Sequence, residues 1–164
     1  MAGWVPYAAL VAAAIIVFLP VMCGGGFFWD DYQLLVNNHP VQSGLGGLRD
    51  IWFTTKNPDY FPLTSTLFWI EWHLWGTAGT AWIYHIVNVA IHAGSGVLLW
   101  RVLRRLRVPG AFLAALLWVV HPVNVESAAW IAEGKNTLSM LCLCGAVLLY
   151  LRAIQLRHPG EYGW

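Results

Sequence analysis

Hydrophobic residues run along this chain in long stretches that contain no charged side chain, and polar residues gather between them. Five stretches lack Asp, Glu, Lys and Arg: 1–29, 32–48, 72–100, 108–125 and 136–151. A helix needs about 20 apolar residues to cross a hydrocarbon core roughly 30 Å thick. Stretch 32–48 is too polar for this, because it holds Asn, His, Gln, Gly and Ser residues. The other four stretches are apolar enough and predict four transmembrane helices.

The predicted fold class is all-α, a polytopic membrane helical bundle that forms one domain over residues 1–164. Pro122 ends the third helix early, because proline breaks the hydrogen-bond ladder. In the long loop between the first two helices, apolar residues at helical spacing predict an interfacial helix whose Glu71 and His73 face water or headgroups. The expected elements are transmembrane helices at about 7–28, 79–100, 109–123 and 137–152, an outer loop 29–78 with an interfacial helix 63–75, and an outer connection 122–136.

Composition agrees with a membrane protein. The chain is 59% hydrophobic and 10% charged, with a mean hydropathy of +0.59, whereas soluble domains are about one-quarter charged. A net charge of +1 argues against a basic nucleic-acid binder. All three cysteines fall in apolar stretches, so neither a disulfide framework nor a metal cluster is indicated.

The basic residues are distributed unequally between the two sides of the predicted bundle. Basic residues mark the cytoplasmic side of a membrane protein, and six of the nine follow the second or fourth helix. Seven of the eight acids fall on the other side. We therefore expect both termini to be cytoplasmic and the acidic loop to lie outside. The six residues are Arg101, Arg104, Arg105, Arg107, Arg152 and Arg157.

Two adjacent acids, Asp30 and Asp31, directly follow the first apolar stretch. Two carboxylates this close repel each other, so the pKa of one should rise. Such a group can act as a general base or bind a cation. The alternative is that acids at a helix end are simply solvated, although the neighbouring Trp29 and Tyr32 place this pair among interfacial aromatic residues.

Polar residues also lie within the second and before the fourth predicted helix. At helical spacing, four side chains of the second helix share one face; they either make interhelical hydrogen bonds or line a cavity. No third strong ligand accompanies the two histidines, which disfavours a metal site. Lys135 precedes the fourth helix either by accident of topology or as a phosphate contact. The four side chains are His85, Asn88, His92 and Ser95.

In their order along the chain, four short motifs resemble those of the GT-C glycosyltransferases, and most closely the bacterial tetratricopeptide-repeat relatives of the TMTC O-mannosyltransferases. The protein O-mannosyltransferases are more distant. The resemblance covers about residues 15–152. The motifs are Trp29-Asp30-Asp31, Tyr-Phe-Pro-Leu-Thr at 60–64, Tyr-His-Ile-Val-Asn at 84–88 with His92, and His-Pro-Val-Asn-Val-Glu-Ser at 121–127.

The resemblance implies an enzyme that moves a sugar from a polyprenyl-phosphate carrier to a hydroxyl of an acceptor protein or glycan, on the outer face of the membrane. Either Asp30 or Asp31 would be the general base. A nearby cation would stabilise the leaving phosphate, and Lys135 is the candidate for it on its chemistry more than on a motif. The resemblance implies no firm cofactor, although a divalent cation could bind at the two acids. The remaining residues expected to bind or shape the substrate site are Tyr60, His85, Asn88, His121 and Glu126.

The same resemblance places the protein in a bacterial inner membrane, with its acidic loop in the periplasm. Relatives continue into further spans and tetratricopeptide repeats, so we expect this chain to be an N-terminal part. Phe61 stands where eukaryotic relatives tend to have arginine; this departure favours an alternative, a scaffold or pseudoenzyme of the same fold. A small transporter is a third hypothesis. It is disfavoured because no predicted span contains a buried acid for a proton relay.

Overall fold

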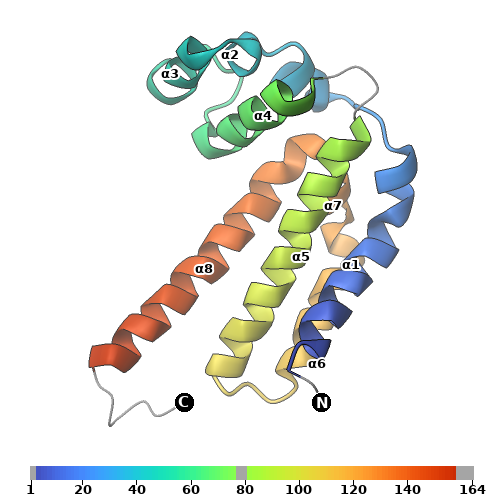
Figure 1. The fold of residues 1–164 in the computed structure, drawn as a ribbon, viewed down its shortest axis with the longest axis vertical. Coiled ribbons are helices and arrows are strands. Elements are labelled where there is room, and N and C mark those ends of the chain that lie inside the picture. The colour runs from blue at the N-terminus through green and yellow to red at the C-terminus, as the bar shows by residue number, and fades with distance from the viewer. Residues whose placement is uncertain (1–2, 77–80, 158–164) are drawn as a thin grey trace.

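The computed structural model describes residues 3–76 and 81–157, and every regular element in those ranges is helical. A bundle of helices stands side by side, and a second group of helices gathers at one end of it (Figure 1). The fold-class prediction is therefore confirmed. The bundle consists of α1 (Val5–Gly24), α5 (Ala81–Arg105), α6 (Ala111–Val120) and α8 (Gly134–Arg157). The second group, which we name the cap, comprises η1 (Tyr32–Val36), α2 (His39–Gln42), α3 (Leu45–Phe53) and α4 (Pro62–Trp75).

Among the described residues, three helical segments are long and apolar enough to cross a membrane: α1, α5 and Ile131–Gln155. A fourth span results if α6 is counted together with the segment after it, from which it is bent by 51°. That segment consists of η2 (Pro122–Asn124) and α7 (Val125–Ala129), and η3 (Ile131–Glu133) then leads into α8. The bend falls at the predicted Pro122. α1 ends at Gly24, before its predicted end at residue 28, because glycines occupy positions 24–26 and favour an extended exit.

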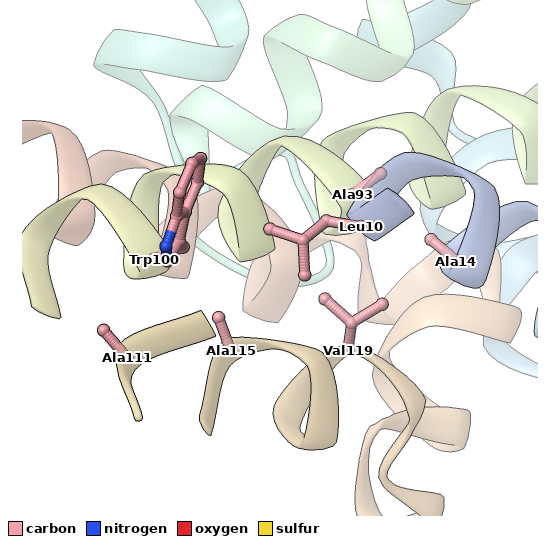
Figure 2. Packing of buried hydrophobic residues seen from close by; sticks show 7 residues of the cluster. All are labelled: Leu10, Ala14, Ala93, Trp100, Ala111, Ala115 and Val119. Carbon is pink, nitrogen blue, oxygen red and sulfur yellow. The ribbon is translucent and has the colours of Figure 1, made fainter. Parts of the chain in front are cut away.

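Helix α5 lies at the centre of the bundle and packs against α1, α6 and α8. Its contacts with α1 and α6 rely on small side chains, among them Ala14, Ala93 and Ala115 (Figure 2). In lipid, helices gain little from the hydrophobic effect, so close van der Waals packing must hold them together. A Cβ atom on Gly96 would lie 2.3 Å from Cγ2 of Val119. Glycine at this position therefore permits the closest approach of α5 and α6.

The cap packs on one end of the bundle through a second apolar cluster. Phe68 of α4, Tyr84 of α5 and Ile131 of η3 meet there with Leu35, Val41 and Ile51 of the cap. The Tyr84 hydroxyl also donates a 2.8 Å hydrogen bond to the Gly76 carbonyl, next to the end of α4. These contacts fix the cap on the end of α5.

The prediction for Glu71 is wrong, whereas His73 is exposed as predicted. Glu71 is only 3% exposed, and burial raises the pKa of its carboxyl to about 8. The face of α4 turned toward the protein carries Thr64, Ser65, Phe68 and Glu71. The tryptophans of α4 are only partly covered, so the more aromatic face of this helix is not its buried face.

Candidate functional site

The two acids lie in a tight turn between α1 and the cap, and the structure separates their roles. Asp31 is 1% exposed. Its Oδ2 accepts a 2.8 Å hydrogen bond from the Phe28 amide, and its Oδ1 accepts a 2.7 Å hydrogen bond from the Ala132 amide, 101 residues away in sequence. We call this pair of hydrogen bonds the Asp31 clasp. It joins the turn after α1 to η3, and it uses both carboxylate oxygens.

Burial is the main influence on the pKa of Asp31, which rises from 3.8 to about 6. The amides of Phe28 and Ala132 and the indole of Trp130 oppose this rise because they stabilise the carboxylate, and repulsion from Asp30 adds to it least. The predicted rise at one of the two acids is therefore confirmed, but desolvation rather than mutual repulsion is its chief cause.

Asp30 has a different environment. It is half-buried, and in the part of the chain that the structure describes its carboxylate makes no hydrogen bond or ion pair. Both of its oxygens are thus free to accept a proton from a ligand. Of the two candidate bases, Asp30 therefore has unoccupied carboxylate oxygens, whereas both Asp31 oxygens accept amide hydrogens.

A cavity of about 290 Å³ brings together three of the predicted residues, Asp31, His85 and Glu126. We call it the Asp31 cavity. His85 is 3% exposed, and neither ring nitrogen meets hydrogen-bond geometry, although the backbones of Gly26 and Ala129 lie beside the ring. A Cβ on Gly25 would lie 2.4 Å from Nε2 of His85. The remaining walls are mostly apolar: Val21, Gly25, Gly26, Phe28, Val125, Ala129 and Trp130.

Lys135 and Tyr60 line a different space, a groove of about 630 Å³ between the start of α4 and α8. We call it the Lys135 groove. The ammonium of Lys135 lies 2.8 Å from Glu133 Oε1 and 5.3 Å from the centre of the Phe61 ring. A cation over an aromatic face is attracted by the ring quadrupole. Phe61 stands where eukaryotic relatives tend to have arginine. Its ring contacts the Lys135 ammonium on one side.

Asn88 and His121 make hydrogen bonds to the backbone and line neither the Asp31 cavity nor the Lys135 groove. The Asn88 Nδ2 donates to the carbonyls of Ser127, Ala128 and Trp130 at 3.0, 3.1 and 3.0 Å, and its Oδ1 accepts a hydrogen bond from Thr137. The exposed His121 accepts a 3.2 Å hydrogen bond from the Val123 amide at the start of η2. Asn88 therefore fixes the segment that forms one wall of the Asp31 cavity.

Trp29 was not among the predicted site residues, yet it stands beside Asp30 with unusual geometry. Its φ of +46° is unfavourable for a bulky residue and costs about 1–3 kcal/mol. Its indole is 71% exposed and stacks on that of Trp130, with ring centres 6.2 Å apart and planes 19° apart. No spacing rule relates two residues so far apart in sequence, so only the fold could reveal the pair.

The two acids offer a cation unequal carboxylates. Each Asp31 oxygen already accepts one amide hydrogen, which leaves one lone pair on each oxygen. In residues 3–76 and 81–157, no three His, Cys, Asp or Glu side chains come together as a ligand set.

Comparison with known proteins gives one consistent result. The chain is 31% identical to the protein O-mannosyl-transferase TMTC4 of Homo sapiens over 89% of its own length and 23% of the relative. It is similar to the TMTC protein O-mannosyl-transferases. Other matches are F38B6.6 of Caenorhabditis elegans, a protein O-mannosyl-transferase 28% identical over 87% of this chain and 22% of the relative, and Tmtc2 of Drosophila melanogaster, 27% identical over 90% and 17%. The chain thus spans about a fifth of the length of these relatives. No protein-family model matches it, and no solved structure does.

Proposed function

We propose that this chain carries the acid-containing part of a GT-C-type membrane glycosyltransferase, which transfers a sugar from a polyprenyl-phosphate carrier to a hydroxyl of an acceptor protein or glycan. The observation that carries the proposal is the meeting of Asp31, His85 and Glu126 in one cavity beside the free carboxylate of Asp30. Its support is the similarity to proteins named as O-mannosyl-transferases.

Asp30 acts as the general base in this proposal. The acceptor oxygen attacks the anomeric carbon of the sugar, the bond from that carbon to the phosphate oxygen breaks, and the carrier phosphate leaves with the electron pair. Asp30 takes the acceptor proton, which its unoccupied oxygens allow. Asp31 holds the turn through its clasp and so positions Asp30. We assign no step to a divalent cation.

The carrier phosphate binds in the Lys135 groove. The groove combines one ammonium with mostly apolar walls on the face of α8, a combination that suits an anionic headgroup with a long hydrocarbon chain. Lys135 exchanges its ion pair with Glu133 for the phosphate and stabilises the charge that develops on the leaving group. Tyr60 lines the same groove.

We further propose that the cap end of the bundle lies outside a bacterial inner membrane and that both termini are cytoplasmic. The support is the excess of arginines at the opposite end of α5 and beyond. Further spans and tetratricopeptide repeats beyond this segment belong to the same proposal.

The test uses purified protein in lipid with radiolabelled polyprenyl-phosphate mannose and a serine- and threonine-rich acceptor peptide. Asp30→Asn should bind the carrier as the wild type does but transfer at least about a hundredfold more slowly, because a general base contributes about 10²–10⁴. Asp59→Asn, an exposed acid of the same loop, is the matched control and should transfer normally. Lys135→Gln should weaken carrier binding.

Two results would contradict the proposal in different ways. Normal transfer by Asp30→Asn would remove Asp30 as the base. Carrier binding without transfer in the wild type and in every variant would favour the alternative, a scaffold of the same fold. Phe61 in place of an arginine is the feature that makes this alternative specific to the chain.

A further inference from the structure

We propose that Trp29 and Trp130 form a stacking platform that binds the ring of a pyranose sugar beside Asp30. The proposal rests on the proposed function only for the source of that sugar. Its basis is the geometry of the two indoles, the strained backbone of Trp29 and the buried imidazole of His85 in the cavity next to them.

The platform is held rigidly by contacts that do not involve its free face. Phe28 packs edge-on against both indoles, with ring centres 6.1 Å apart in each case. The Trp130 Nε1 donates a 3.3 Å hydrogen bond to the Phe28 carbonyl. The Asp31 clasp then fixes the same turn to η3. These contacts hold the Trp29 ring in place although the residue is 71% exposed.

The backbone of Trp29 points to a function for this exposure. Within residues 3–76 and 81–157, only Trp29 and Arg107 have a positive φ without being glycine. Glycine would relieve the strain at position 29, and three glycines already stand just before it. Strain at a bulky residue persists where the surrounding structure enforces it, commonly in ligand sites. A membrane-anchoring tryptophan would need no such conformation, because an indole in ordinary helical backbone reaches the interface equally well.

The chemistry of the surface suits a pyranose. An indole face carries the negative part of the ring quadrupole and a large apolar area, and it attracts the polarised C–H groups that line one face of a pyranose ring. The hydroxyl groups of the sugar need hydrogen-bond partners in turn. His85 is 97% buried in the adjoining cavity with both ring nitrogens outside hydrogen-bond geometry. Asp30, the next residue after Trp29, is half-buried and has a free carboxylate.

Saturation-transfer difference NMR on the purified protein in nanodiscs tests the platform without any need for turnover. The probes are methyl α-mannopyranoside and methyl α-glucopyranoside, with the acyclic polyol mannitol for comparison. Both pyranosides should receive saturation on their ring C–H protons, and mannitol should not. Trp29→Leu should reduce the signal by about fivefold or more, whereas Trp29→Phe should keep it within about twofold because an aromatic face remains.

Trp4→Leu is the matched control. Trp4 is 68% exposed, close to the 71% of Trp29, but lies at the opposite end of α1, and its replacement should change nothing. Leucine at position 29 meets the same backbone strain as tryptophan, so Trp29→Leu tests the ring rather than the fold. Equal signals in Trp29→Leu and the wild type, or equal signals from mannitol and the pyranosides, would overturn the proposal.

A second measurement needs no variant for its main result. In protein labelled with 5-fluorotryptophan, the ¹⁹F resonances of Trp29 and Trp130 should shift when a pyranoside is added, while the other tryptophan resonances stay in place. Trp29→Phe assigns the first of these resonances. Shifts spread over all tryptophans, or none at position 29, would contradict the platform.

Two further titrations show whether the bound sugar belongs to the donor or to an acceptor. Polyprenyl-phosphate mannose that shifts the Trp29 resonance, when polyprenyl phosphate alone does not, identifies the donor sugar as the occupant. A shift with the free glycosides but not with the loaded carrier identifies an acceptor glycan. Trp29-dependent binding without any transfer would leave the platform and refute the proposed function. Transfer that Trp29→Leu does not affect would support the proposed function and refute the platform.

Discussion

Replacing Asn88 should unfold the protein more readily rather than remove a substrate contact. Its side chain is 5% exposed, and its amide group connects α5 to the segment between α6 and α8. The two N–H hydrogens of Nδ2 serve three backbone carbonyls, and Oδ1 accepts from the Thr137 hydroxyl. Asn88→Ala thus removes three donated hydrogen bonds and leaves the carbonyls that accepted them without this donor.

The expected loss follows from this count. Each buried hydrogen bond contributes about 0.5–1.5 kcal/mol, so the free energy of unfolding should fall by about 2–4 kcal/mol. Asn88→Asp should lose at least as much, because a carboxylate would face three carbonyl oxygens without a donor. Thr137→Val removes only one of the bonds and should cost about 1 kcal/mol. Since the two residues share that bond, the double variant should lose less than the sum.

Equilibrium unfolding in mixed micelles, followed by circular dichroism, measures these differences. Asn37→Ala is the control, because Asn37 is exposed and lies outside the Asn88 network; it should unfold like the wild type. A loss under about 0.5 kcal/mol for Asn88→Ala would refute the hydrogen-bond argument. Wild-type stability combined with lost carrier binding would instead make Asn88 a ligand contact.

Two further predictions concern stability. Glu71 ionises with a pKa near 8 instead of 4.5, so its contribution to stability is complete below about pH 4.5 and is lost as the pH rises to about 8. Wild-type Tm should therefore fall between about pH 5 and 8. Glu71→Gln should flatten that profile and raise Tm at about pH 8, whereas parallel profiles would contradict the burial. Gly96→Ala should cost about 1–3 kcal/mol through its collision with Val119. Gly145→Ala, a helical site with open space around it, should be neutral or stabilising in the same unfolding assay.

Charge-free stretches and proline positions were sufficient to predict the long helices, because the bilayer imposes a length and forbids unpaired backbone. α5 and the break at Pro122 are examples. Glu71 is a residue whose burial the same pattern does not predict. In a soluble helix the apolar face is the buried one, but α4 rests on the end of α5, and its tryptophans are left partly exposed. At such a position the polar face can be the covered one.

The sequence indicates candidate residues for a site but not how those residues are grouped in space. Asp30 and Asp31 look equivalent in the sequence, and only the Ala132 amide, which approaches from a distant segment, distinguishes them. Asn88 and His121 are polar residues within the motifs, yet the side chains of both make hydrogen bonds to the backbone of nearby segments. Lys135 and the acids were expected at one centre, whereas the structure gives them separate spaces. Long-range pairings of this kind leave no periodic signal in a single sequence.

The Asp31 clasp can form only after most of the chain has been synthesised. Its two halves are 101 residues apart, and at translation rates of 5–20 residues per second the second half is synthesised about 5–20 s after the first. Throughout that interval α1 is available for membrane insertion, but the turn behind it has no amide from η3. The strained conformation of Trp29 can be enforced only once η3 has arrived beside the cap. Closure of the clasp therefore requires that η3, which directly precedes α8, has reached the turn after α1.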